Sequence, residues 1–514
     1  MAEVKLPWFT RALAAVAPRM AFERVRYQQA VQLLAGKKRG YDAASAGRRT
    51  AGWRTPATSA NAENSPNLAR LRFVGRDLER NNPWAVKALY TITSNVVGEG
   101  IRAKAVNGNA GQRKRAEKLW KQWAESTACD FDGIRNFYSI QDVVMRTVAR
   151  DGECLVRFRR NPDMPNVPLQ LQVLEPDYLD PYRIINPDTG NRVIDGIEVD
   201  MQGRRVAYWL FPHHPGDTRT VLWFNALVSH RVPLDQVVHI YKQDRPGELR
   251  GISWFAPVGI TLRDLSDFEG AELVRQKIAA CFTVFVKDVD AGDDPTTDMT
   301  QDPLNEILEK VEPGIVEYLS PGKDVTFATP PETHTFDAFT RAQLRKIAAG
   351  LGLTYESLTG DMSQTNFSSA RMGWVEMGRN VESWRWRLLI PMLCIPVWEH
   401  FIEAASLTGP SLEGVDSYWT APRRETIDPL KETEASMRAM RAGIKSWSET
   451  ARENGYDPEE LAAEMGEDIQ RFDRYGLILD CDPRKTALNG MPRVRVTATD
   501  KTATSSELGE DSDA

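Results

Sequence analysis

The sequence has few of the residues that build disulfide frameworks or metal centres. Its five cysteines are scattered, odd in number and never spaced as C-x-x-C, which argues against a disulfide scaffold or zinc ribbon and fits a reducing compartment. Of the six histidines only His213 and His214 are adjacent, and they lie in a turn rich in Pro and Gly. We therefore expect no metal and no cofactor.

Several motifs of catalytic and nucleotide-binding proteins are also missing. The sequence contains no G-x-x-x-x-G-K-[ST], no H-E-x-x-H and no G-x-S-x-G. The acidic segment 288–302 does not fit a calcium loop, because Gly292 and Asp293 fall where an oxygen ligand and then a glycine are required. These absences lower the expectation of an enzyme.

Long apolar runs are absent as well. The most apolar segment, residues 388–398, is interrupted by Pro391 and Pro396, and it is far shorter than the roughly 20 residues of a membrane-spanning helix. Arg11 and Arg19 bracket the apolar part of the N-terminus, which therefore does not resemble a signal peptide. We expect a protein made and working in the cytosol, or in a particle assembled there.

Net charge is small, at −6, which argues against a surface coated in basic residues to grip nucleic acid. The charge is nevertheless unevenly spread, because residues 1–60 hold 11 Lys or Arg against 3 Asp or Glu. This basic arm and the Ser/Thr/Asp-rich residues 497–514 have the composition of flexible segments.

Helical and strand patterns alternate along the first half of the chain. Helices are predicted over 67–81, 82–100 and about 110–126, and another begins with a capping box at Ser139 and Asp142. Short β-rich runs separated by turn residues follow, at 153–160, 168–176, 191–200, 204–212 and 236–242. This pattern predicts an α+β domain.

Helices dominate again after Pro246. One long helix is expected to start near Ser253, followed by a short helix at 303–311 and a hairpin of 314–319 with 325–328. Further helices are predicted over 336–350, from a cap at Ser368 or Ser369, and within 427–476, where Gly443 is a stop and Ser446 a restart.

The polar segment LTGDMSQTNFSSAR, residues 358–371, lies between two of these helices. Its simplest interpretation is a surface connection. A family resemblance suggests more. Four segments follow one another along the chain: RDLERNNPWAVKAL, VPLDQVVHIYKQDRPGELRGISWFAPV, LRKIAAGLGLTYESLTGDMSQTNFSSARMGWVE and IDPLKETEASMRAMRAGIKSWSE. In sequence and in order they closely resemble the portal proteins of tailed bacteriophages, of the lambda type. The resemblance covers about residues 60–480.

The resemblance implies an α+β portal fold that assembles into a ring. Its parts would be a basic arm (1–60), an α/β wing (61–250), a first stem helix (251–283), an α/β clip (284–334), a second stem helix (335–356), a tunnel loop (357–368), a long helix returning to the wing (369–425), a helical crown (426–480) and a disordered tail (481–514).

Portal proteins form a homo-oligomeric ring, usually of twelve subunits, at one vertex of the head, through which double-stranded DNA is packaged and ejected. The resemblance implies as partners the terminase large subunit, the major capsid and scaffold proteins and the head–tail connector, with no membrane and no enzymatic activity. The residues expected to face DNA without sequence specificity are Asp361, Met362, Ser363, Gln364, Thr365, Asn366 and Phe367.

Two other hypotheses belong to different classes. A DNA-processing or head-maturation enzyme would need clustered carboxylates holding metal, or an activated nucleophile, and neither is legible in the sequence. Another shell or connector protein would not be expected to carry an insert like 284–334 between two long helices.

Overall fold

The computed structural model describes residues 57–217, 227–280, 284–288, 323–327, 336–423 and 428–477, together with residues 48, 51, 52 and 219. The chain divides into two compact units, residues 1–59 and 60–514, and every helix and strand given below belongs to the second. The predicted helix 303–311, the predicted strand 314–319, most of the acidic segment 288–302 and the tail 481–514 lie outside the described residues, as does nearly all of the arm.

Helices open the second unit. They are α3 (Ala60–Asn64), α4 (Leu68–Asn81), α5 (Pro83–Val96), α6 (Ala110–Ala124) and α7 (Phe137–Asp151). Among them, α5, α6 and α7 begin at asparagine caps. The Asn82 side chain accepts the Ala85 amide at 3.1 Å ahead of Pro83, so α5 starts where predicted. The capping box predicted at Ser139 is wrong, because Asn136 caps α7 by accepting the Ser139 amide at 2.9 Å.

Two antiparallel sheets follow. One has the order β3 (Leu169–Leu174), β2 (Glu153–Arg160), β8 (Val237–Tyr241), and the other has the order β4 (Arg192–Ile194), β5 (Ile197–Val199), β6 (Arg205–Leu210), β7 (His230–Pro233). The single run predicted over 191–200 is two strands, since Asp195 and Gly196 turn the chain with positive φ. The sequence pattern did not predict β7.

Strand β2 separates two hydrophobic cores. Cys154 and Val156 point into the larger core with α5 and α7, whereas Leu155 belongs to a second core shared with the β4–β7 sheet. Successive side chains of a strand point to opposite faces, so one apolar run serves both cores. This explains why β2 begins with an unbroken buried stretch.

A cluster of large aromatic side chains joins distant parts of the chain. The ring of Trp120 on α6 lies with its centroid 5.0–5.8 Å from those of Trp123, Phe137, Trp398, Phe401 and Trp419. The last three come from α12 (Ile395–Leu407) and β11 (Asp416–Thr420). Strand β11 also pairs antiparallel with β1 (Arg102–Val106), a pairing absent from the sequence-based predictions.

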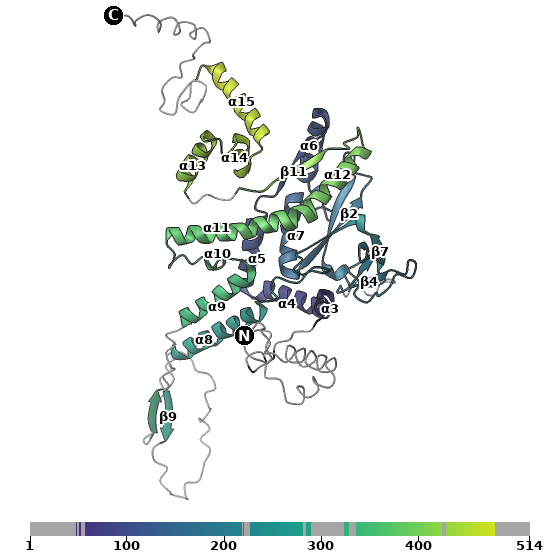
Figure 1. Cartoon of the computed structure of the whole chain (residues 1–514). Helices are drawn as coiled ribbons and strands as arrows, with labels where there is room; N and C mark the ends of the chain where they lie inside the picture. The colour runs from purple at the N-terminus through teal and green to yellow at the C-terminus, as the bar shows by residue number, and fades with distance from the viewer. Residues whose placement is uncertain are drawn as a thin grey trace, which may run out of the picture. The chain divides into compact units, whose positions relative to one another are not determined.

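Two helices carry the predicted stem. The first, α8 (Gly259–Ala280), starts six residues later than predicted, because Trp254–Val258 form turns. It packs against α9 (Phe336–Leu351) (Figure 1). The centroid of the Phe268 ring lies 5.6 Å from that of Phe336. Beyond them, β9 (Val284–Asp288) pairs antiparallel with β10 (Lys323–Phe327).

The predicted long helix is continuous but changes its winding. After α10 (Tyr355–Thr359) come α11 (Phe367–Trp384), a π-helical segment η5 (Arg385–Cys394) and α12 (Figure 1). The Ile395 amide bonds to the Ile390 carbonyl five residues back, so the chain passes Pro391 without a break. The two prolines therefore interrupt the apolar run in the sequence without breaking the predicted long helix.

This continuous helix has a membrane-like composition. Among the described helices, the stretch Ser368–Leu407 is long and apolar enough to cross a membrane by length and composition, but 56% of its most apolar window is buried inside the fold.

The buried side chain of Arg385 donates to the carbonyls of Asn95 and Val96, each at 2.7 Å, and so caps the C-terminus of α5.

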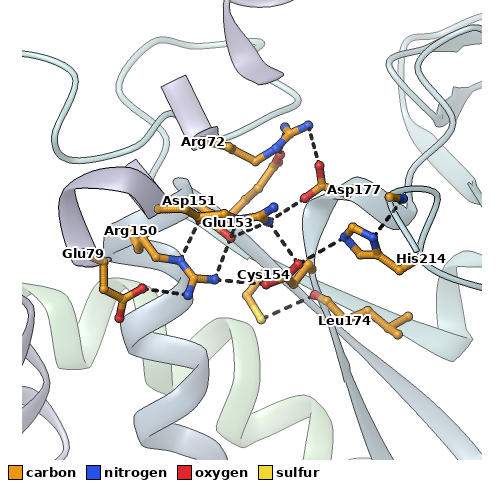
Figure 2. A network of polar contacts seen from close by, with 12 residues as sticks. Arg72, Glu79, Arg150, Asp151, Glu153, Cys154, Leu174, Asp177 and His214 are labelled. Carbon is orange, nitrogen blue, oxygen red and sulfur yellow. Dashed lines mark hydrogen bonds and ion pairs between the residues drawn. The ribbon is translucent and has the colours of Figure 1, made fainter. Parts of the chain in front are cut away.

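A buried polar network fixes α4 against α7 and the ends of β2 and β3 (Figure 2). Arg250 reaches the Glu153 carboxylate at 2.6 Å, and His239 lies 2.9 Å from the same group. Burial alone would raise the pKa of Glu153, but the Arg250 charge and the hydrogen bonds from His239 and Arg250 outweigh it and leave the pKa well below its usual range.

The C-terminal helices are α13 (Pro429–Arg441), α14 (Trp447–Glu453) and α15 (Pro458–Tyr475). The predicted restart at Ser446 is confirmed, because its hydroxyl accepts the Glu449 amide at 3.0 Å. Lys104 on β1 reaches Asp457, the cap of α15, at 2.6 Å. Neither α13 nor α15 has a buried residue.

Candidate DNA-facing site

The predicted tunnel loop is shorter in the structure than in the sequence-based prediction. Residues Ser357–Thr359 belong to α10, whose Leu358 is fully buried, and Phe367 begins α11. The non-helical residues are 360–366. Gly360 ends α10 in the left-handed region at φ 75°, where a residue without Cβ is favoured.

Asp361 organises the first half of this loop. Its Oδ2 accepts the Tyr355 hydroxyl at 2.9 Å, its Oδ1 accepts the Ser363 amide at 3.0 Å, and its own amide donates to Thr359 Oγ1 at 3.1 Å. Hydrogen bonds from the Ser363 hydroxyl and amide and from Tyr355 lower the pKa of Asp361 to about 2. The carboxylate is therefore charged at neutral pH and already engaged.

Asn366 organises the second half. Its side-chain oxygen accepts both the amide and the hydroxyl of Ser369 at 2.8 Å, so it is the N-cap of α11. The prediction of a cap at Ser368 or Ser369 is wrong, because the helix starts one residue after Asn366. The Thr365 amide closes a turn onto the Met362 carbonyl at 3.1 Å.

The remaining loop side chains face outward. Met362 is 59% exposed, and Ser363, Gln364 and Asn366 are also exposed, whereas Thr365 is half-buried. The loop thus brings the residues predicted to face DNA together on one short segment. The side chain of Phe367 lies outside the described part of the structure.

Sequence reasoning missed the residues that support the loop. Tyr355 lies outside the predicted set, although it holds Asp361, and the Arg345 guanidinium lies 5.5 Å from the centre of the Tyr355 ring. Arg341 also acts electrostatically on Asp361, although it pairs with Asp337 at 2.7 Å. A loop that lacks Lys and Arg is therefore flanked by the arginines of α9.

The His213–His214 turn contributes to a second polar cluster. Glu175, Asp177 and His214 place ligand-type atoms within 4.8 Å of one another. The two carboxylates already have a partner, since Arg76 binds Asp177 at 2.5 Å and Glu175 at 3.2 Å. Nδ1 of His214 accepts the Gly216 amide at 3.0 Å, and its Nε2 lies 3.2 Å from Glu175. The cluster extends the ion network of Figure 2 and has the chemistry of a structural contact.

Comparison with known proteins defines the class. Residues 46–385 match the family described as phage portal protein, lambda family. The chain belongs to the lambda family of phage portal proteins. It is accordingly a structural component of the capsid portal and not an enzyme, and its mixed helices and sheets form the α+β portal fold.

Two portal proteins of other phages are similar to this chain in sequence. The chain is 30% identical over 432 residues to a probable portal protein of Halomonas phage phiHAP-1, with 79% of this chain and 81% of the relative covered. It is 23% identical over 466 residues to portal protein B of Escherichia phage lambda, with coverages of 80% and 86%. A chain in the neck of an empty GTA particle gives 14% identity, coverages of 77% and 94%, and a TM-score of 0.43.

Proposed function

We propose that this chain forms a homo-oligomeric ring, a dodecamer, at the unique capsid vertex, and that double-stranded DNA passes through its centre during packaging and ejection. Residues 360–366 supply the surface that faces the duplex. The observation that carries this proposal is a short exposed loop without Lys or Arg, held in one shape by Asp361 and Asn366.

A loop of this chemistry suits a channel through which DNA must slide. Each Lys or Arg contact to phosphate adds about 0.9 to the salt dependence of binding, and identical contacts from every subunit would clamp the duplex. Hydroxyl and amide groups of Ser363, Gln364 and Thr365 offer hydrogen bonds without that charge. Sequence specificity requires contacts to base edges in the grooves of the duplex. None is expected here, because nothing in the loop suggests an element that enters the major groove.

The other parts of the chain are assigned by their position along it. Residues 61–250 are the wing, α8 and α9 the paired stem, and 284–334 the clip, while 369–425 return to the wing and 426–480 form the crown. The clip docks the terminase large subunit during packaging and the head–tail connector afterwards, and the wing meets capsid and scaffold proteins. Assembly takes place in the cytoplasm of the bacterial host.

Exposed apolar side chains support the ring. Ile260, Leu273 and Val274 on α8 are 79%, 55% and 54% exposed, and Phe339 on α9 is 43% exposed. On α13 and α15, Leu430, Met437, Met465 and Tyr475 are also exposed. Apolar side chains are stabilised when they are removed from water, and neighbouring subunits would cover these side chains in a ring.

Loop substitutions test the function of residues 360–366. Replacing residues 362–365 by a Gly/Ser linker of equal length keeps both Asp361 and Asn366, so ring assembly and the melting temperature should stay nearly unchanged while DNA packaging falls. Ser363→Lys should slow packaging most at low salt, where the added charges are least screened. Ser411→Lys, on the exposed turn before β11, is the matched control. Normal packaging by both loop variants would refute the assignment of the loop.

A further inference from the structure

One face of the β3–β2–β8 sheet ends in an arginine pair. Leu155, Arg157 and Arg159 lie on the same face of β2, because alternate residues of a strand share a face. Leu155 enters the second core, but beyond it the sheet carries Arg157 opposite Gln172 and Arg159 opposite Gln170. The apolar lining of this face thus gives way to two cations and two neutral amides.

Neither arginine has a carboxylate partner within the described residues. Nε of Arg157 is buried and makes no hydrogen bond there, and Nε of Arg159 donates at 2.9 Å only to the neutral Gln172 amide oxygen. Burial lowers the pKa of both groups, and the charge of Arg159 lowers the pKa of Arg157 further. Half-buried charges without a counter-ion cost folding free energy.

The next residue along the strand, Arg160, does have a carboxylate partner. Arg160 points to the opposite face of β2, is 72% exposed in its side chain and pairs with Glu403 at 2.7 Å. Arg150, at the end of α7 and just before β2, binds Glu79, Asp151 and Glu175. Arginines in this part of the fold are therefore commonly paired, and Arg157 and Arg159 depart from that pattern.

Apolar side chains border the pair. The Arg159 guanidinium lies 5.5 Å from the centre of the Phe131 ring, which is 46% exposed, and Ile134 in the same loop is 69% exposed. Leu234, 42% exposed, begins the turn that contacts β2 ahead of β8. Arginine and exposed aromatic groups together are characteristic of the residues that dominate protein–protein binding.

We propose that this arginine patch, consisting of Arg157, Arg159, Phe131 and Ile134, is a docking site for an acidic segment of a partner protein. A Glu or Asp side chain of the partner would bind between the two guanidinium groups, which match a carboxylate in planar, two-pronged geometry. A neighbouring apolar side chain of the partner would cover Phe131 and Ile134. The proposal concerns the wing surface and goes beyond the ring and its channel.

A phosphate backbone fits the patch less well than a peptide. Protein surfaces that bind DNA are strongly positive and polar, whereas this patch holds two cations bordered by the exposed apolar side chains of Phe131 and Ile134. An acidic peptide needs room for only one or two carboxylates and gains from the apolar border. We therefore choose a protein partner, and DNA binding becomes an outcome of the test.

The test uses the full chain with Arg157→Gln and Arg159→Gln combined, and Arg160→Gln as a matched control on the same strand. The probe is a short fluorescein-labelled peptide of alternating Glu and Leu, whose anisotropy reports binding. The double variant should bind about tenfold or more weakly, since hydrogen bonds to charged groups are lost. Arg160→Gln should bind as the unchanged protein does.

A second measurement separates docking from a structural role. Because neither charge has a carboxylate partner within the described residues, the double variant should keep or raise the melting temperature while it loses the peptide. A lower melting temperature with unchanged peptide binding would overturn the proposal. The proposal would also be overturned if the unchanged protein did not bind the peptide, or if it bound a peptide with Gln in place of Glu equally well. It would likewise be overturned if the double variant bound the peptide normally and lost only the binding of a short labelled DNA duplex.

Discussion

The hydroxyl of Tyr355 donates a 2.9 Å hydrogen bond to Asp361 and so ties the first residue of α10 to the loop that follows the helix. Asp361 in turn accepts the Ser363 amide at 3.0 Å. The loop proposed to face DNA is thus held by a residue outside it. Substitutions that loosen the loop should therefore differ from those that lower the stability of the protein.

Tyr355→Phe should loosen the loop without unfolding the protein. It removes one hydrogen bond to Asp361 and keeps the ring, so the melting temperature should barely change, while the Ser363 amide should exchange with solvent several-fold faster. Hydrogen exchange followed by mass spectrometry measures this, with the exposed Tyr475→Phe as control. Unchanged exchange at Ser363 would show that Tyr355 does not order the loop.

The same contacts predict how the loop depends on pH. The folded pKa of Asp361, about 2, lies below the usual 3.8. The stabilising contribution of this carboxylate is therefore fully present above about pH 4 and is lost as the pH falls through 2. Protection of the Ser363 amide, corrected for the intrinsic exchange rate, should stay constant between pH 8 and 5. A loss of protection within that interval would contradict the assignment.

Asn366→Ala should destabilise α11. Loss of an N-cap side chain costs about 1 kcal/mol, so the free energy of unfolding should fall by that amount in denaturant titrations. Ser368→Ala, on an exposed residue two positions later, should stay within roughly 0.5 kcal/mol. Equal losses in both variants would mean that the serine contributes to the cap.

Glu153→Gln should be among the most damaging single changes in residues 61–250. It leaves Arg250 without its buried carboxylate partner, a change that typically costs about 3–5 kcal/mol. Urea titration of the unchanged protein and the variant measures the loss. A cost near zero would show that the network of Figure 2 is not stabilising.

Acid should weaken the same network in the unchanged protein. Burial lowers the pKa of His239 despite its hydrogen bond to Glu153, so the neutral ring is favoured in the folded state. Folding lowers the pKa of both groups. The free energy of unfolding should therefore be highest above pH 6.5, the usual pKa of His, and should fall as the pH drops below it. It should fall further below pH 4.5, the usual pKa of Glu. A free energy of unfolding that increases as the pH falls from 7 to 4 would contradict this.

Two glycine substitutions should have opposite effects. A Cβ at Gly75 on α4 would lie 2.4 Å from the Arg150 carbonyl oxygen, so Gly75→Ala should cost about 1–3 kcal/mol by forcing the helices apart. A Cβ at Gly270 on α8 meets nothing within 4 Å, and Gly270→Ala should stabilise by up to about 1 kcal/mol. Thermal melts of both variants measure this difference, and equal effects would refute the close approach of α4 to α7.

Local signals in the sequence predicted most helices and strands. Pro83 and Ser446 each mark a helix start that the structure contains, and the α+β class followed from the alternation of patterns. Pairings between distant segments left no such signal. Nothing near β1 indicates that it pairs with β11, because that register depends on the Trp120 cluster and on tertiary packing.

The candidate site was only partly predictable for the same reason. The polar composition of residues 361–366 is visible in the sequence, but the cap at Asn366 and the anchor at Tyr355 depend on where α10 and α11 begin. The long helix through Pro391 was predicted from the family resemblance, although proline usually ends a helix. Here a π-helical segment carries the chain past it.

The central claim is that residues 360–366 line the channel that DNA passes through, and photo-crosslinking in filled particles tests it most directly. A benzophenone amino acid at position 363 should form covalent adducts with the packaged DNA. The same group at position 201, which is fully exposed and lies in the part of the chain proposed to be the wing, should give none. Adducts from 201 but not from 363 in assembled, DNA-filled particles would contradict the account.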